Sequence, residues 1–240
     1  MASEHIVSAY DAELGGLRRS IAEMGGIAEK MLSDATRALV RHDTVLAQAV
    51  IAADSKLDEI QHGVEERAIL TIARRQPMAV DLREIVSAIR VAGDIERIGD
   101  LAKNIAKRAV AISTQLAAQK YFVGAEHMAD LAGHQLKDVL DAYLERDDAR
   151  AMDVWHRDGE IDALYTSLFR ELLTYMMEDP RNISSCTHLL FCAKNIERIG
   201  DHTTNIAETV HFLITGMTLQ TERPKNDASS FTTLDAASGG

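Results

Sequence analysis

The chain has 240 residues, 46% hydrophobic and 26% charged, which is the composition of an ordinary globular protein. Its formal net charge of −11 excludes general electrostatic attraction to nucleic acid or to an anionic bilayer. The sequence contains no recognisable signal peptide and no apolar run of the ~18 residues that a transmembrane helix requires, so we expect a cytoplasmic protein.

The first half of the chain predicts three helices. Apolar residues over 14–38 recur at alternating spacings of three and four, the heptad pattern of a long helix in a left-handed bundle. Asp43 offers an N-cap to a second helix that runs to about Arg75. Pro77 predicts the start of a third helix, which ends at about Ile112.

The second half repeats this plan. We expect a helix over 125–146, a helix over 147–178 that Asp147 caps, and a last helix that follows Pro180 and ends near Gly216. The predicted fold is therefore all-α, with two tandem three-helix bundles related by a pseudo-twofold axis. The predicted parts are a first bundle over 1–112, a connection over 113–124, a second bundle over 125–216 and a flexible tail over 217–240.

One hexapeptide marks the two halves as copies of each other. Ile-Glu-Arg-Ile-Gly-Asp occupies residues 95–100 and again residues 196–201, and Asn-Ile-Ala follows at the same distance in both places. The spacing of four puts the Glu and the Asp of each copy on one helix face, where two like charges repel by a few tenths of a kcal/mol. Gly99 lowers helix stability by about 1 kcal/mol relative to alanine, and we expect it to allow a backbone or a ligand to approach closely.

Two further acidic pairs interrupt the inward apolar stripe of the second helix in each half. Asp54 and Asp58 are four residues apart, as are Asp158 and Asp162. A buried carboxylate must be paired, protonated or bound to metal, and an oxygen-rich cluster selects hard cations such as Mg²⁺, Mn²⁺ or iron. The sequence therefore predicts two metal sites, formed by Asp54, Asp58, Glu96 and Asp100 and by Asp158, Asp162, Glu197 and Asp201.

With its doubled motif and its double three-helix plan, the chain over about residues 10–216 resembles the PhoU family of bacterial phosphate-signalling and transport accessory proteins. The resemblance implies multinuclear metal clusters (Mg, Mn, Fe or Zn) at the same eight acids, with Asn104, Asn205 and Glu208 as candidate additional ligands. It also implies that the protein forms a homodimer and has no catalytic activity. Contact with the membrane would be indirect, through partner proteins. These partners are the ATPase subunit of a phosphate ABC transporter and a phosphate-sensing histidine kinase, with repression of the phosphate-starvation response as the outcome. Lys107 departs from the repeat, because it stands at the place of Glu208.

Two other functions remain open on the sequence. A helical di-metal enzyme, either an oxidase or a phosphohydrolase, is suggested by two Glu-x-x-His strings and by the dipeptide His42-Asp43. The strings end at His62 and His211, but the other half of the repeat has no counterpart for either, and Arg146 stands opposite His42. The third reading is a structural helical adaptor, whose acids are solvated and paired with cations such as Lys56, Arg97 and Lys103.

Overall fold

The structure, a computed structural model, describes residues 2–113 and 121–219, with side chains from residue 12 onward. The helices are α1 (Ala2–Arg41), α2 (Thr44–Arg75), α3 (Val80–Ile112), α4 (Val123–Glu145), α5 (Asp148–His156), α6 (Asp158–Glu178) and α7 (Ile183–Thr215), with a 3₁₀ turn at Pro180–Asn182. Most of the predicted connection and of the predicted tail, residues 114–120 and 220–240, lies outside the described residues.

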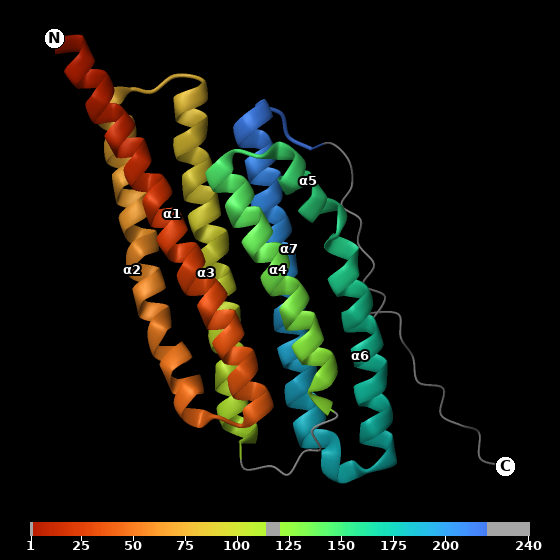
Figure 1. Cartoon of the computed structure of the whole chain (residues 1–240). Helices are drawn as coiled ribbons and strands as arrows, with labels where there is room; N and C mark the ends of the chain where they lie inside the picture. Colours follow the sequence, from red (N-terminus) through yellow and green to blue (C-terminus); the bar gives the residue numbers. More distant parts are fainter. Residues whose placement is uncertain (1, 114–120, 220–240) are drawn as a thin grey trace.

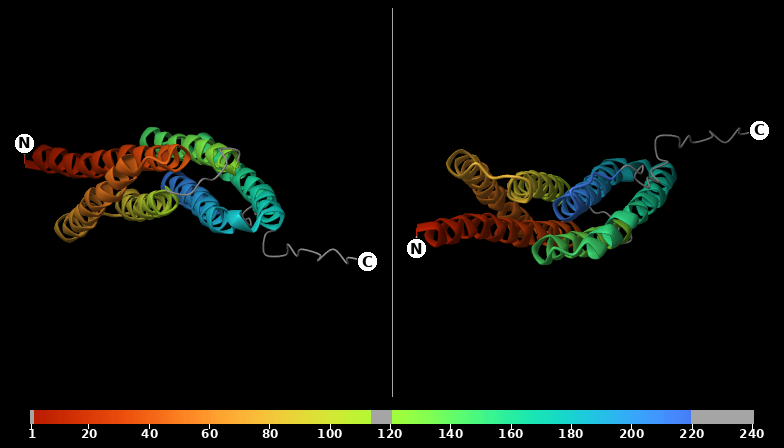
Figure 2. Two further views of the ribbon diagram at one scale, coloured as in Figure 1. Left: turned by 90° about the horizontal axis from the view of Figure 1, so that it is seen from below. Right: turned by 90° about the horizontal axis from the view of Figure 1, so that it is seen from above.

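The helices form two bundles that lie side by side (Figure 1). Helices α1 to α3 make the first bundle, and α4, α5 with α6, and α7 make the second. Figure 2 looks along the helices and shows α3 beside α7 and α1 beside α4, with α2 and α6 at the outer edges. Neighbouring helices across this junction run antiparallel, which is the arrangement that a twofold axis perpendicular to the helices produces. The prediction of an all-α double three-helix bundle is confirmed.

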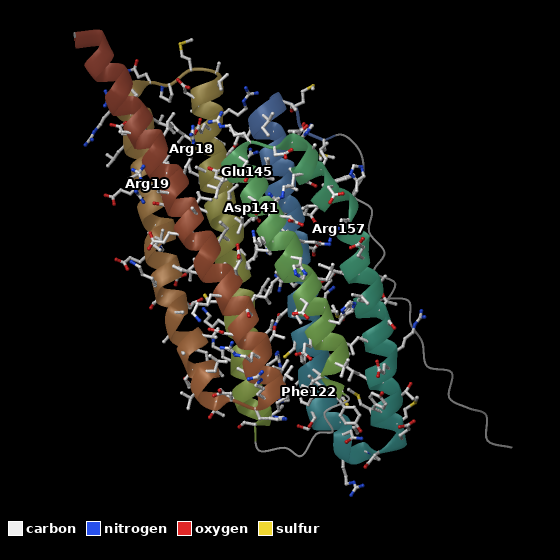
Figure 3. The ribbon with its side chains drawn as sticks, in the orientation of Figure 1. Arg18, Arg19, Phe122, Asp141, Glu145 and Arg157 are labelled. Carbon is white, nitrogen blue, oxygen red and sulfur yellow. The ribbon has the colours of Figure 1, made fainter. Side chains whose placement is uncertain are left out.

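An ion cluster around one buried carboxylate joins the two bundles. Glu84 on α3 is 5% exposed, and its carboxylate accepts a hydrogen bond from Arg18 Nε of α1 at 2.7 Å. Its other oxygen accepts from Arg146, the residue that ends α4. Figure 3 shows Arg18 on α1, close to the upper part of α4. One carboxylate from the first half is therefore bound by an arginine of each half, which fixes the bundles relative to each other.

The predicted helix caps are confirmed in both halves. The Asp43 carboxylate accepts from the N–H of Leu46 at 2.9 Å, and the Asp147 carboxylate accepts from the N–H of Arg150 at 3.0 Å. Each bond satisfies one of the N–H groups that the first turn of a helix leaves free. Gly216 ends α7 with φ +77°, a left-handed conformation that glycine adopts without steric penalty.

Two predicted helices differ from the structure. The expected single helix over 147–178 is broken at Arg157, which has φ −91° and ψ 3°, and Figure 3 labels this residue where α5 passes into α6. The Arg157 carbonyl accepts from Gln135 Nε2 of α4 at 3.2 Å, so a contact from another helix stabilises the break. Helix α3 begins at Val80 rather than at Pro77, because Ala79 has φ +48° and lies outside the helical region.

The apolar core runs through both bundles and includes Cys186 and Cys192. Both cysteines are buried free thiols, and their spacing of six residues on one helix is too long for a disulfide between them. Within residues 2–113 and 121–219, no helix combines the length and the apolar character needed to cross a lipid bilayer.

Candidate functional site

Two glycines bring the acidic pairs of neighbouring helices face to face. A Cβ atom on Gly99 would lie 2.2 Å from Leu57 Cδ2, and a Cβ atom on Gly200 would lie 2.8 Å from Ile161 Cδ1. Leu57 and Ile161 each stand between the two aspartates of their helix, and each glycine stands between the Glu and the Asp of its motif. A close approach is present at Gly99, but the group that approaches is a side chain of α2 and not the backbone or the ligand that the sequence predicts.

The first acidic cluster consists of Asp54 and Asp58 on α2 and Glu96 and Asp100 on α3. Asp54 is 8% exposed, and the other three side chains are half-buried. Burial raises the pKa of Glu96, and the charges of Asp100, Asp58 and Asp54 raise it further, against the opposing effect of Arg97. The structure therefore brings together the four acids that the sequence pattern predicts for this half.

A lysine ammonium lies among these four carboxylates. Lys103 Nζ is 2.5 Å from Asp54 Oδ2 and 2.5 Å from Asp100 Oδ1, so it joins the pair on α2 to the pair on α3. Burial lowers the pKa of Lys103, but its hydrogen bonds to Asp100 and Asp54 outweigh this and raise the pKa well above its usual value. Arg97 lies 3.5 Å from Asp100 at the exposed edge. The pairing of acids with Lys103 and Arg97, expected of a structural adaptor, is thus present in the first half.

The second acidic cluster consists of Asp158 and Asp162 at the start of α6 and Glu197 and Asp201 on α7. Asp158, Asp162 and Glu197 are 4%, 6% and 5% exposed, so this cluster is more buried than the first. Burial raises the pKa of Glu197, and the charges of Asp201 and Asp162 raise it further, while Lys194 lowers it. The four acids predicted for this half are also neighbours in the structure.

The hydrogen bonds of the second cluster differ from those of the first. Asp158 Oδ1 accepts from the hydroxyl of Thr204 at 2.7 Å. Glu197 Oε1 accepts from Lys194 Nζ at 2.8 Å. The other oxygen, Glu197 Oε2, is buried and has no hydrogen-bond partner within the described part of the chain. A buried carboxylate oxygen without a donor is a position where a cation would be stabilised.

The two clusters fit a metal ion to different degrees. With the side chains as they stand, no three His, Cys, Asp or Glu residues in the described ranges form a group that could hold one ion. In the first cluster the Lys103 ammonium takes the position between the helices, so its donors do not fit a metal. In the second cluster, rotation of Glu197 from Lys194 towards Asp162 and Asp201 would form an all-oxygen donor set of the kind that hard cations prefer.

The three candidate additional ligands lie apart from these sets or have other partners. Asn104 is exposed on α3. Asn205 donates to Asp94 Oδ1 at 3.2 Å, and Glu208 accepts from Trp155 Nε1 at 3.1 Å. Asn205, Glu208, Asp94 and Glu96 line a groove of about 560 Å³ between the two bundles. Asn205 and Glu208 therefore contribute to the junction of the bundles.

The residues that suggested an enzyme have structural partners. His62 Nδ1 lies 2.7 Å from the Asp58 carbonyl of its own helix, and His211 Nδ1 lies 2.8 Å from Asp148 Oδ1. His42 packs edge-on against Phe122, and Asp43 caps α2. These contacts place the two Glu-x-x-His histidines on different helices and give each a separate partner.

Two contacts of the site were missed by reading the sequence motif by motif. The sequence pattern predicts Lys103 only as a surface partner of the acids and gives no role to Thr204, whereas the structure places both on an aspartate of the neighbouring helix. Alignment of the two halves of the repeat could have identified both residues, because a shift of 101 residues superimposes the two hexapeptides and pairs Lys103 with Thr204. The contact of Asp94 with His202, at 2.9 Å between α3 and α7, has no such signal.

Two helical bundles that each carry facing Glu/Asp pairs define the class of this protein, and comparison with known proteins identifies the family. The PhoU domain matches residues 21–109 and 125–210, so the chain belongs to the PhoU family. It is 59% identical to the phosphate-specific transport system accessory protein PhoU homolog of Rhizobium meliloti, over 96% of this chain and 97% of that protein. It is 51% identical to the protein of the same name from Caulobacter vibrioides, over 95% of this chain and 99% of that protein.

Solved structures give the same result. The crystal structure of PhoU from Pseudomonas aeruginosa is similar with a TM-score of 0.84 and 38% identity, over 87% of this chain and all of that chain. The phosphate transport system regulatory protein PhoU from Streptococcus pneumoniae is similar with a TM-score of 0.80 and 28% identity, over 88% of this chain and all of that chain.

Proposed function

We propose that this protein regulates phosphate uptake and the phosphate-starvation response by binding other proteins, without catalysing a reaction. The observation that carries the proposal is identity of 59% over almost the whole chain to a protein named as an accessory of the phosphate-specific transport system. The net charge of −11, which disfavours nucleic acid as the target, supports regulation by protein contact.

The partners that fit this role are the ATPase subunit of the phosphate ABC transporter and a phosphate-sensing histidine kinase. Both would be met on the cytoplasmic side of the membrane, and the protein would act there as a homodimer. Several large apolar side chains support a contact surface, because Met78 and Val80, at the turn between α2 and α3, are 81% and 50% exposed. Met217, two residues after α7, is 65% exposed, and α7 ends at the same end of the molecule as the turn between α2 and α3 (Figure 1).

We further propose that carboxylate-bound metal ions brace pairs of helices in this regulator. Of the eight predicted acids, the four of the second cluster would hold the ion, which would be Mg²⁺, Mn²⁺, iron or zinc, because Lys103 already bridges the first cluster. The support is the convergence of two acidic pairs in each half, and above all the buried Glu197 oxygen that has no hydrogen-bond donor in the described residues. A metal bound there would link α6 to α7 and fix their relative position.

The test is made in cells from which the native gene has been deleted. Wild-type protein should restore repression of phosphate-starvation genes at high phosphate, and tagged protein should capture the transporter ATPase or the kinase in a phosphate-dependent manner. A chain with all eight acids changed to Asn or Gln should fold but fail to repress. Full repression by this variant would show that metal is incidental, and failure of the wild-type chain to restore repression would contradict the regulatory function.

A further inference from the structure

The junction of the two bundles carries an apolar pocket at one end. It lies where the beginning of α3 meets the end of α7, at the upper end of Figure 1. Its volume is about 370 Å³, which is within the ~300–1,000 Å³ that is usual for ligand sites. The residues that line this end pocket are Ala79, Leu82, Arg83, Val86, Phe212 and Gly216. One arginine is therefore the only charged side chain in its wall.

The charge of Arg83 is not balanced within the part of the chain that the structure describes. There its Nε is buried without a hydrogen-bond partner, and its guanidinium forms no ion pair. The guanidinium lies against the end of α7, because a Cβ atom on Gly216 would be 1.8 Å from Arg83 Nη1. The partial negative charge of a helix C-terminus attracts the guanidinium there but leaves the Nε–H without an acceptor. A ligand that supplied this acceptor would remove an unfavourable buried group.

The chemistry of the end pocket fits a carboxylate with apolar groups beside it. A guanidinium binds a carboxylate through two parallel N–H···O hydrogen bonds, and Nε is one of its donors. A phosphate group carries nearly two charges and three strong acceptor oxygens, which one guanidinium among apolar side chains would leave mostly unsatisfied. The single charge of an Asp or Glu side chain matches the single charge of Arg83, and apolar neighbours of that acid would match the other walls.

The exposed apolar side chains beside the pocket favour a protein segment over a small molecule. Met78 precedes the pocket residue Ala79 in the chain and is 81% exposed, and Met217 follows Gly216 and is 65% exposed. Leu82, in the wall itself, is 38% exposed. A small molecule in the pocket would leave the two methionines in water, whereas a protein segment could cover them as well. Methionine and arginine are also enriched at protein interfaces.

We propose that the end pocket binds an Asp or Glu residue, flanked by large apolar side chains, of a partner protein, with Arg83 bound to the carboxylate. The inference rests on the proposed regulation by protein contact and deepens it, because it states which feature of the partner this chain recognises. The bound segment contacts both bundles at once, since α3 belongs to the first and α7 to the second.

The first experiment identifies the occupant of the pocket. In cells that lack the native gene, the full chain carries the photoreactive p-benzoylphenylalanine in place of Leu82, and mass spectrometry identifies the segment attached after irradiation. We expect a segment of the transporter ATPase or of the kinase in which Asp or Glu stands beside large apolar residues. The same photoreactive residue in place of Lys107, exposed near the other end of α3, should not attach to that segment. Attachment only to residues 220–240 of the same chain, only to a second copy, or to nothing above the Lys107 control would overturn the inference.

The second experiment measures the affinity of the full chain for the purified partner that was attached. Arg83→Met keeps an apolar stem without the charge and should weaken binding roughly tenfold or more. Arg74→Met removes an exposed arginine of the same end that does not line the pocket, and it should change the affinity less than about twofold. Arg83→Met should melt no lower than the wild type, because no ion pair in the described residues is lost. A lower melting temperature with unchanged affinity would show a structural role and overturn the inference.

A double substitution tests the contact itself. Neutralising the acid of the attached segment, by Glu→Gln or Asp→Asn, should weaken binding as much as Arg83→Met does, and the two changes together should cost little more than either one. Losses that multiply would overturn the pairing of that acid with Arg83 while leaving regulation by protein contact intact. A wild-type chain that captures neither partner and does not restore repression would contradict the proposed function, and this inference with it.

Discussion

The contact between Gly99 and Leu57 allows a test of how the acidic pairs are brought together. Replacement of Gly99 by alanine would place a Cβ atom 2.2 Å from Leu57 Cδ2. This is ~1.3 Å less than the ~3.5 Å of an ordinary carbon contact. Leu57 is fully buried, so its methyl group can retreat only by disturbing its neighbours. Gly93, on the same helix, is a matched control, because a Cβ atom there would meet nothing within 4 Å.

The two substitutions should change stability in opposite directions. Overpacking at Gly99 costs about 1–3 kcal/mol, and the better helix propensity of alanine returns up to about 1 kcal/mol. We therefore expect Gly99→Ala to destabilise by about 1 kcal/mol. Gly93→Ala gains the propensity without the clash and should stabilise by about 1 kcal/mol. The difference of about 2 kcal/mol corresponds to a gap of roughly 5 °C in Tm for a chain of this size.

Urea denaturation followed by circular dichroism measures both free energies, and a double substitution identifies the cause. Leu57→Val shortens the side chain that the new Cβ atom would meet, so Gly99→Ala should cost less in that background than in the wild type. Strict additivity of the two changes, or equal stabilisation by Gly93→Ala and Gly99→Ala, would refute the argument that this contact sets the distance between α2 and α3.

Three further predictions concern charge. Lys103→Met should destabilise by about 2 kcal/mol because it leaves buried Asp54 without its counter-ion, whereas Lys107→Met should change the urea midpoint little. Glu84→Ala should cost about 1 kcal/mol, because it removes the carboxylate that binds two half-exposed arginines at the junction, and an unchanged urea midpoint would contradict that role. Burial raises the pKa of Glu29 above 4.5, so the folded state binds this proton more tightly than the unfolded state. Stability should therefore gain a contribution as pH falls from 7, complete below pH 4.5, and thermal melts of Glu29→Gln should lack it.

The sequence predicted the helices wherever a local signal was strong. Asp43 and Asp147 cap helices in both halves because a side-chain carboxylate can satisfy a backbone N–H three residues on, wherever the chain then packs. The break at Arg157 was not predictable in this way. The carbonyl of that residue is bound by Gln135 from another helix, and a contact between residues 22 apart leaves no periodic signal.

The sequence by itself determined the repeat, the helical class and which acids face one another. Spacings of four, the glycine within each hexapeptide and the 3.6-residue period act within one helix, so they can be read directly from neighbouring residues. Tertiary structure alone decided how the charge of each cluster is balanced. Whether a lysine reaches a carboxylate depends on the distance between two helices and on the space around the side chain. Lys103 meets Asp54 across that gap, while Thr204 at the repeated position can offer Asp158 only a hydroxyl.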